Sequence, residues 1–167
     1  MAILEILTKE NPRLRVKANR VPRVDDTVRR LMDDMVETML DAPGVGLAAT
    51  QVGVSQRVMV MKVDNQLYTL ANPEVIRSSG EQVGFEGCLS VPGYIGEVAR
   101  AEKVTMRALN RNGKEVRIKG EGLLARAIQH EIDHLDGVLF IDRLTSLDTL
   151  REVEVGAEED AAEAVAV

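Results

Sequence analysis

The sequence is poor in cysteine and histidine, and it contains no long apolar run. A single cysteine cannot form an internal disulfide, so Cys88 is a buried thiol, a nucleophile or a metal ligand. No apolar run approaches the ~18 residues that would suggest a membrane span. The first residues also lack a basic start followed by an apolar signal stretch. We therefore expect a cytoplasmic protein that has no membrane partner.

The net charge of -6 comes from one end of the chain. All 21 Lys and Arg residues lie at or before Arg151, and 21 of the 27 acidic residues balance them there. We predict one domain over residues 1–150 and an acidic tail over 151–167, whose composition is more typical of a disordered segment than of packed structure. Because the positive and negative charges of residues 1–151 are equal in number, the charge gives no reason to expect a specific nucleic-acid partner. The basic residues between Lys9 and Arg30 are interpreted as a solvated face.

Hydrophobic periodicity predicts two helices. Apolar residues at i, i+3 and i+4 spacing over residues 26–40 predict an amphipathic helix that begins near Asp25 and ends before Pro43. A second helix is predicted between Gly122 and Gly137, with both histidines on it.

The middle of the chain is predicted to be mostly β. Strands are expected at 57–63, 66–70, 104–109 and 114–120, and the last two flank a hairpin turn signal. The segment around Cys88 is interpreted as irregular, because it contains Gly87 and the pair Pro92-Gly93. The expected fold is α+β, with antiparallel β-sheets packed around a central metal-binding helix and with an N-terminal amphipathic helix.

Both histidines occur in one short motif, His130-Glu131-Ile132-Asp133-His134. On a helix this spacing places the two imidazoles on one face, where they can bind one metal ion. The carboxylate of Glu131, about 100° further round the axis, can reach a metal-bound water instead of the ion. The motif has only three fixed positions and occurs by chance, but here it uses the only histidines of the chain. We therefore predict a metal site with Glu131 as the general acid/base.

Cys88 is the best candidate for a third ligand. Catalytic sites commonly use three protein ligands and leave one position for water, and no histidine follows His134. The ion would stabilise a thiolate at Cys88. On these residues alone, a zincin-like endopeptidase with another third ligand stays open. A structural metal centre also stays open, although no second cysteine or third histidine exists to complete four ligands.

Three motifs occur in the order that is typical of the peptide deformylase family: GVGLAATQ (44–51), EGCLS (86–90) and HEIDH (130–134). The sequence resembles this family over roughly residues 3–145, and three motifs together are far more specific than one. The resemblance implies removal of the formyl group from N-formyl-methionine at the N-terminus of new polypeptides, with Glu131 as acid/base. It also implies one divalent metal on Cys88, His130 and His134: Fe²⁺ as the native ion, with Zn²⁺, Ni²⁺ or Co²⁺ able to replace it.

The resemblance further implies roles for residues around the metal. The side chain of Gln51 and the backbone N–H of Leu89 would stabilise the oxyanion. Small residues such as Gly46 would let an extended substrate approach closely. The resemblance also implies an apolar pocket for the methionine side chain. Apart from the resemblance, the residues leave two alternatives open for Arg100: an ion pair with Glu86 that steadies the Cys88 loop, or an exposed side chain without a partner. The residues that we place at or beside this pocket are Val45, Glu86, Gly87, Leu123 and Ala127.

The expected substrates are nascent peptides, so the protein could contact the ribosome. Some members of the family dock on the ribosome through a basic C-terminal helix. The tail of this chain is acidic and ribosomal RNA would repel it, so we do not expect docking by that route. Ribosome association by another route stays open.

Overall fold

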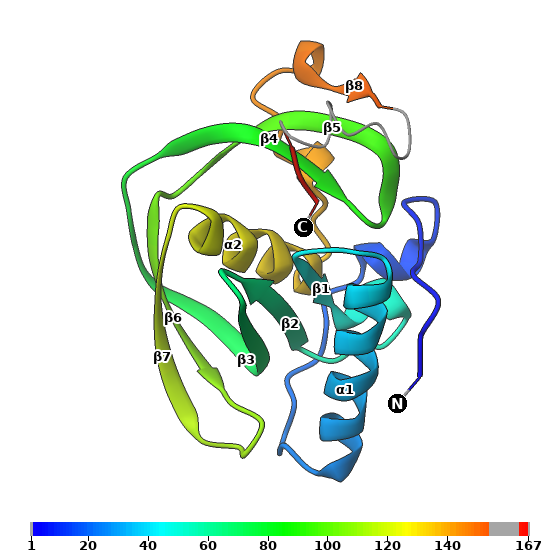
Figure 1. The fold of residues 1–167 in the computed structure, drawn as a ribbon, viewed down its shortest axis with the longest axis vertical. Coiled ribbons are helices and arrows are strands. Elements are labelled where there is room, and N and C mark those ends of the chain that lie inside the picture. Colours follow the sequence, from blue (N-terminus) through cyan, green and yellow to red (C-terminus); the bar gives the residue numbers. More distant parts are fainter. Residues whose placement is uncertain (1, 154–163, 167) are drawn as a thin grey trace.

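Two β-sheets and two α-helices form the computed structural model, which describes residues 2–153 and 164–166 (Figure 1). The helices are α1 (Asp26–Asp41) and α2 (Leu123–Leu135), with 3-10 helices η1 (Pro12–Arg15), η2 (Ala49–Val52), η3 (Phe140–Asp142) and η4 (Leu147–Thr149). The strands are β1 (Gly46–Ala48), β2 (Val58–Val63), β3 (Gln66–Ser79), β4 (Gln82–Cys88), β5 (Val91–Arg100), β6 (Lys103–Leu109), β7 (Glu115–Glu121), β8 (Arg151–Glu152) and β9 (Ala164–Ala166).

The strands form a five-stranded sheet in the order β1-β2-β3-β6-β7 and a four-stranded sheet in the order β8-β5-β4-β9. The pairings are antiparallel except that of β4 with β9, which is parallel. Helix α2 lies in the centre, between the β4–β5 hairpin and the five-stranded sheet (Figure 1). The predicted α+β fold, with antiparallel sheets around a central helix, is therefore confirmed.

Helix α1 forms where the amphipathic pattern predicted it. The carboxylate of Asp25 caps its N-terminus by accepting a hydrogen bond from the N–H of Val28 at 3.0 Å. Three residues of its apolar stripe, Met32, Met35 and Met39, are fully buried in a core shared with strands β1 and β2. Burial of this stripe fixes the helix on the sheet beside the segment that leads into β1.

Helix α2 is the centre of a second core. It begins after Gly122 and ends before Gly137, and both glycines have positive φ angles, 61° and 78°. Its apolar side packs on strands β2 and β6 of the five-stranded sheet. The buried residues at this contact include Ala125, Ala127, Ile128, Met59, Met61 and Met106.

The segment around Cys88 is a hairpin whose ladder is regular up to Gly87 and shifts register between Gly87 and Cys88, so its interpretation as irregular holds only at that step. Strands β4 and β5 pair antiparallel, with Leu89 and Ser90 at the turn. Gly87 pairs with Ile95 inside the ladder instead of breaking it. Strand β3 is also longer than predicted and ends at Ser79, because β6 pairs along its second half.

Part of the predicted tail is paired with the four-stranded sheet. Strand β8 pairs with β5, and strand β9 pairs with β4. The expectation of a tail without packed structure does not hold for these residues, because β4 and β5 offer free backbone groups at their edges. Residues 154–163 and 167 of that tail lie outside the described residues. Within the described part of the chain, no helix is long and apolar enough to cross a membrane.

Gly137 provides a test of the C-terminal end of α2. A Cβ atom there would lie 2.6 Å from the carbonyl oxygen of Arg15. We expect Gly137→Ala to reduce the free energy of unfolding by about 2 kcal/mol more than Gly113→Ala. Gly113 is the matched control, because its φ of 77° is nearly the same and the nearest atom, on Val24, would be 3.8 Å away. The control should lose only about 1–2 kcal/mol from backbone strain. Urea unfolding measures both losses, and equal losses would contradict the clash.

Candidate metal centre and active site

Three side chains with metal-binding atoms converge in the interior of the protein. Cys88 is the last residue of β4, and His130 and His134 lie one turn apart on α2; all three are buried. The Cys88 Sγ is 3.2 Å from Nε2 of His134, and that nitrogen is 3.1 Å from Nε2 of His130. Ligands of one tetrahedral ion, each about 2.0–2.3 Å from it, lie about 3.3–3.8 Å apart. The spacing of this group therefore suits one small ion.

The hydrogen bond at His130 leaves its other ring nitrogen available to a metal. Its Nδ1 lies 2.8 Å from Oε1 of Glu86. A carboxylate can only accept, so Nδ1 carries the hydrogen and donates it. In the neutral imidazole, the Nε2 atom, which faces His134, then has a free lone pair. Two imidazoles and one thiol form a donor set that suits a divalent transition-metal ion.

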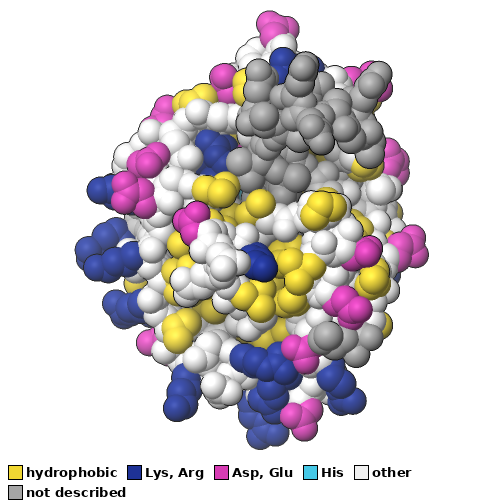
Figure 2. Space-filling model, in the orientation of Figure 1, with side chains coloured by type: hydrophobic (Ala, Val, Ile, Leu, Met, Phe, Trp, Pro, Cys, Tyr) yellow, Lys and Arg dark blue, Asp and Glu magenta, His cyan; other side chains and the backbone are white. Residues whose placement is uncertain are grey.

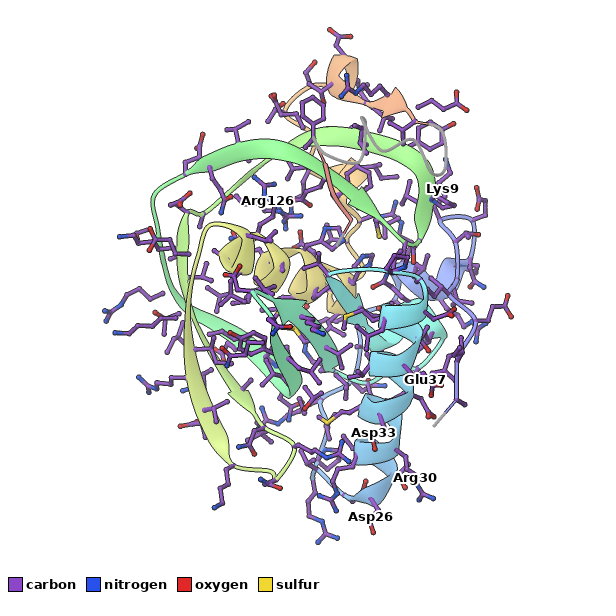
Figure 3. The ribbon with its side chains drawn as sticks, viewed as in Figure 1. Lys9, Asp26, Arg30, Asp33, Glu37 and Arg126 are labelled. Carbon is purple, nitrogen blue, oxygen red and sulfur yellow. The ribbon has the colours of Figure 1, made fainter. Side chains whose placement is uncertain are left out.

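Glu86 is completely buried and is held by two guanidinium groups. Arg100 donates to it from Nε and NH2 at 2.9 Å each, and Arg126 donates from NH1 at 2.5 Å. Burial alone would raise the pKa of Glu86, but hydrogen bonds from Arg100 and His130 outweigh it and hold the pKa well below its usual range. The alternative in which Arg100 pairs with Glu86 is confirmed. Figure 3 shows Arg126 between α2, on which it lies, and the β4–β5 hairpin.

A second carboxylate extends this network to the segment after α2. Asp133 accepts from NH1 of Arg100 at 2.7 Å and from Nε and NH2 of Arg143 at 2.8 and 3.0 Å. Arg100 therefore bridges two carboxylates, one on β4 and one on α2. The network joins the hairpin, the central helix and the chain that follows it.

Glu131 has a buried carboxyl group without a partner. The side chain is fully buried, and neither of its oxygens has a hydrogen-bond partner among the described residues. Burial raises the pKa of Glu131 to about 7, against the lowering effect of His130. Gly46 of β1 lies directly against this group, and a Cβ atom there would overlap the carboxylate. Because an unpaired buried carboxyl is costly, its presence beside three metal donors indicates a functional role.

The side-chain amide of Gln51 points toward the metal donors. Its Oε1 accepts the N–H of Ala48 at 2.9 Å, so its Nε2 faces the other way, 3.0 Å from Oγ of Ser90 and 3.7 Å from Sγ of Cys88. Leu89 follows Cys88 at the hairpin turn. The two residues predicted to stabilise an oxyanion therefore lie next to the donor cluster.

The residues predicted to form a methionine pocket are only partly brought together. Ala127 is fully buried in the core beneath α2, and Val45 packs against that core. Leu123, the first residue of α2, is 38% exposed, and the buried cluster does not include it. Gly87 immediately precedes Cys88 in β4. Their part in a pocket stays a prediction.

Comparison with known proteins agrees with this geometry. The family model described as polypeptide deformylase matches residues 3–150. The chain belongs to the peptide deformylase family. The peptide deformylase of Thermomicrobium roseum is 50% identical over 173 residues, which cover 98% of each chain. That of Symbiobacterium thermophilum is 52% identical over 170 residues, which cover all of this chain and 77% of the relative.

Solved structures of the peptide deformylase family have the same fold. The crystal structure from Legionella pneumophila has a TM-score of 0.84 at 49% identity and covers 89% of each chain. The one from Ehrlichia chaffeensis in complex with actinonin has a TM-score of 0.86 at 40% identity and covers 89% of this chain and 92% of that one. The predicted resemblance is confirmed, and the chain is an enzyme, a metallo-hydrolase of the deformylase family.

Sequence reasoning missed four residues of this deformylase site: Arg126, Asp133, Arg143 and Ser90. A signal existed for Arg126, which precedes His130 by four residues and so lies on the same side of the helix. Ser90, two residues after Cys88, carried no such signal. Arg143 follows η3, and only the folded chain brings it to Asp133.

Removing the charge of Glu86 tests the network. We expect Glu86→Gln to reduce the free energy of unfolding by about 3–5 kcal/mol, because Arg126 would keep its buried charge without a carboxylate and Arg100 would keep only Asp133. Glu74→Gln is the control, since it removes an exposed carboxylate 2.9 Å from Arg107 and should cost less than about 1 kcal/mol. Chemical denaturation of the metal-free proteins measures both. A loss at Glu86 no larger than that of the control would show that the pairing contributes little.

Proposed function

We propose that this chain removes the formyl group from N-formyl-methionine at the N-terminus of newly synthesised polypeptides, in the cytoplasm. Membership of the peptide deformylase family supports the reaction. The observation that carries it is the unpartnered, buried carboxyl of Glu131 beside Cys88, His130 and His134. A hydrolase needs an acid/base group and a metal site in this arrangement.

Cys88, His130 and His134 hold one divalent ion in this proposal. Fe²⁺ is the proposed native ion, and Zn²⁺, Ni²⁺ or Co²⁺ can take its place. A divalent ion there would act as a Lewis acid and lower the pKa of a bound water. The three donors form a group to which no fourth His, Cys, Asp or Glu belongs among the described residues, which leaves a coordination position for water or substrate.

Glu131 moves the proton. Its carboxylate accepts a proton from the attacking water and then donates it to the leaving nitrogen of the peptide, so that formate and a free amine result. No hydrogen-bond donor among the described residues competes for its two oxygens. Gly46 leaves the space that this carboxylate needs.

Gln51 and Leu89 stabilise the negative charge that develops on the formyl oxygen. The N–H of Ala48 and Oγ of Ser90 orient the amide of Gln51, so its Nε2 can donate to the oxyanion in place of its long contact with Sγ of Cys88. The backbone N–H of Leu89, next to Cys88, is the second donor. Loss of one such donor typically costs about 10²–10³ in turnover.

The two other interpretations of the motif fit less well. A zincin-like endopeptidase takes its third ligand from elsewhere, whereas Sγ of Cys88 lies 3.2 Å from His134. A structural metal centre has no use for a buried, unpartnered carboxyl such as Glu131, which would only reduce the stability of the fold.

The activity is tested by formate release. Purified protein, loaded with Fe²⁺ without oxygen, should release formate from formyl-Met-Ala-Ser. Glu131→Gln should keep its metal but lose about 10²–10⁴-fold in turnover, because the amide cannot accept the proton. Glu74→Gln, which changes an exposed side chain of β3, should retain full activity. Formate at the level of a buffer control would end the proposal.

The ligand set is tested separately by metal analysis. Cys88→Ala should weaken binding of the ion by more than ~10²-fold, since changes to outer-shell partners alone cost about 10–100-fold. Competition with a chelator, followed by elemental analysis of the anaerobically purified protein, measures this loss and identifies the native metal. Retention of the ion by Cys88→Ala would favour the endopeptidase interpretation instead.

A further inference from the structure

The outer face of strands β3, β6 and β7 is rich in cations. Side chains alternate along β6: Val104 and Met106 are buried toward α2, whereas Lys103 and Arg107 point away from it. We call the outward side of these three strands the basic face. It consists of Arg77, Lys103, Thr105, Arg107, Arg117 and Lys119, with the acidic residues Glu74, Glu115 and Glu121. Figure 2 shows Lys and Arg side chains along the side of the molecule where Figure 1 places β6 and β7.

Strand register places two opposite-charge pairs on the basic face, Glu74 with Arg107 and Lys103 with Glu121, but it also brings like charges together. Arg107 lies directly opposite Arg117. Thr105 is opposite Arg77 on one side and Lys119 on the other, so these two cations lie about 10 Å apart across the sheet. Like charges in register destabilise a sheet. The arrangement therefore carries a cost that a bound anionic partner would remove.

Most of these cations have no carboxylate partner. Arg107 is neutralised by Glu74 at 2.9 Å and approaches Glu115 at 3.8 Å. The other four cations, Arg77, Lys103, Arg117 and Lys119, form no ion pair with the described residues. They are available to an external anion.

The basic face is hollowed where the unpaired cations gather. Two shallow hollows of about 300 and 520 Å³ share Arg77, Thr105 and Lys119 in their linings. The hydroxyl groups of Ser79 and Thr105, which are in register with Lys103 and Arg77, add donors for phosphate oxygens.

We propose that the basic face is a docking surface for the phosphate backbone of RNA. Cations without ion pairs, hydroxyl donors and the absence of aromatic side chains from the linings of the two hollows suit contact with phosphates and not with bases. RNA is the phosphate-bearing polymer that the proposed function brings near this chain, because nascent peptides emerge from a particle built largely of RNA. Helix α2, which carries the two histidines, packs on the inner side of the same strands. RNA bound to the outer side would therefore not contact the metal donors.

A simpler explanation covers only part of the basic face. Charged residues on an edge strand protect a sheet against aggregation, and this accounts for Arg117 and Lys119 on β7. It also covers Arg77, because only β6 pairs with the second half of β3. It does not account for Lys103, because β6 pairs with β3 on one side and with β7 on the other. An acidic protein partner is also a poorer fit, since stable protein interfaces depend on buried aromatic or apolar anchors.

The distribution of charge would orient the bound RNA. Helix α1 carries five acidic against two basic residues, and Figure 3 shows Asp26, Asp33 and Glu37 along it. RNA would be repelled from α1 and attracted to the basic face. The balanced charge of residues 1–151 thus conceals two regions of opposite sign.

Binding of an RNA duplex of about 24 base pairs to the full chain tests the proposal by fluorescence anisotropy. The wild type should bind at about 50 mM salt and weaken steeply toward 200 mM. The variant Arg77→Glu/Lys119→Glu should lose at least about tenfold in affinity, and its salt slope should fall by about 2. Urea unfolding verifies that this variant is folded, and Arg77→Gln/Lys119→Gln provides a milder version that should also weaken binding.

The matched control is Lys17→Glu/Arg20→Glu, which makes the same change of charge at two exposed residues of another segment. It should bind RNA as the wild type does. Equal losses in the two double variants, or no binding by the wild type, would overturn the proposal. Tighter binding of a DNA duplex of the same sequence would overturn the assignment to RNA. RNA binding is measured without formate release, so its failure would leave the proposed activity untouched.

Discussion

The candidate site depends on the pairing of one buried carboxylate, that of Glu86. Its partners come from two units: Arg100 belongs to β5, and Arg126 belongs to α2. The hairpin cannot leave the helix without separating buried opposite charges, which costs several kcal/mol. The same carboxylate accepts the Nδ1 hydrogen of His130 and so fixes the tautomer of a metal donor. One interaction thus determines both the packing and the chemistry of the site.

Two residues of the candidate site, Glu131 and Gly46, reduce the stability of the fold. The carboxyl of Glu131 is buried without a partner among the described residues, which costs on the order of 1–3 kcal/mol. The adjacent position 46 must be glycine, although glycine weakens a strand. The methionine-rich cores on both sides of the five-stranded sheet offset these costs.

Local sequence predicted the features that local forces determine. Helices α1 and α2, and the two histidines four residues apart, follow from periodicity and capping. The regular part of the hairpin was missed because Gly87 and the pair Pro92-Gly93 interrupt the local pattern, whereas pairing between β4 and β5 determines the ladder. Strands β8 and β9 were missed for the same kind of reason, since edges of a sheet that is itself formed by remote residues determine them.

The three metal donors belong to two structural units, since Cys88 ends a strand of the hairpin and both histidines lie on α2. An ion held by all three is bound only when the hairpin is docked on the helix. Its binding free energy is therefore also free energy of docking. An ion that binds more tightly therefore makes the hairpin open more rarely. The amides of β4 and β5 should then exchange their hydrogens more slowly when the metal centre is occupied.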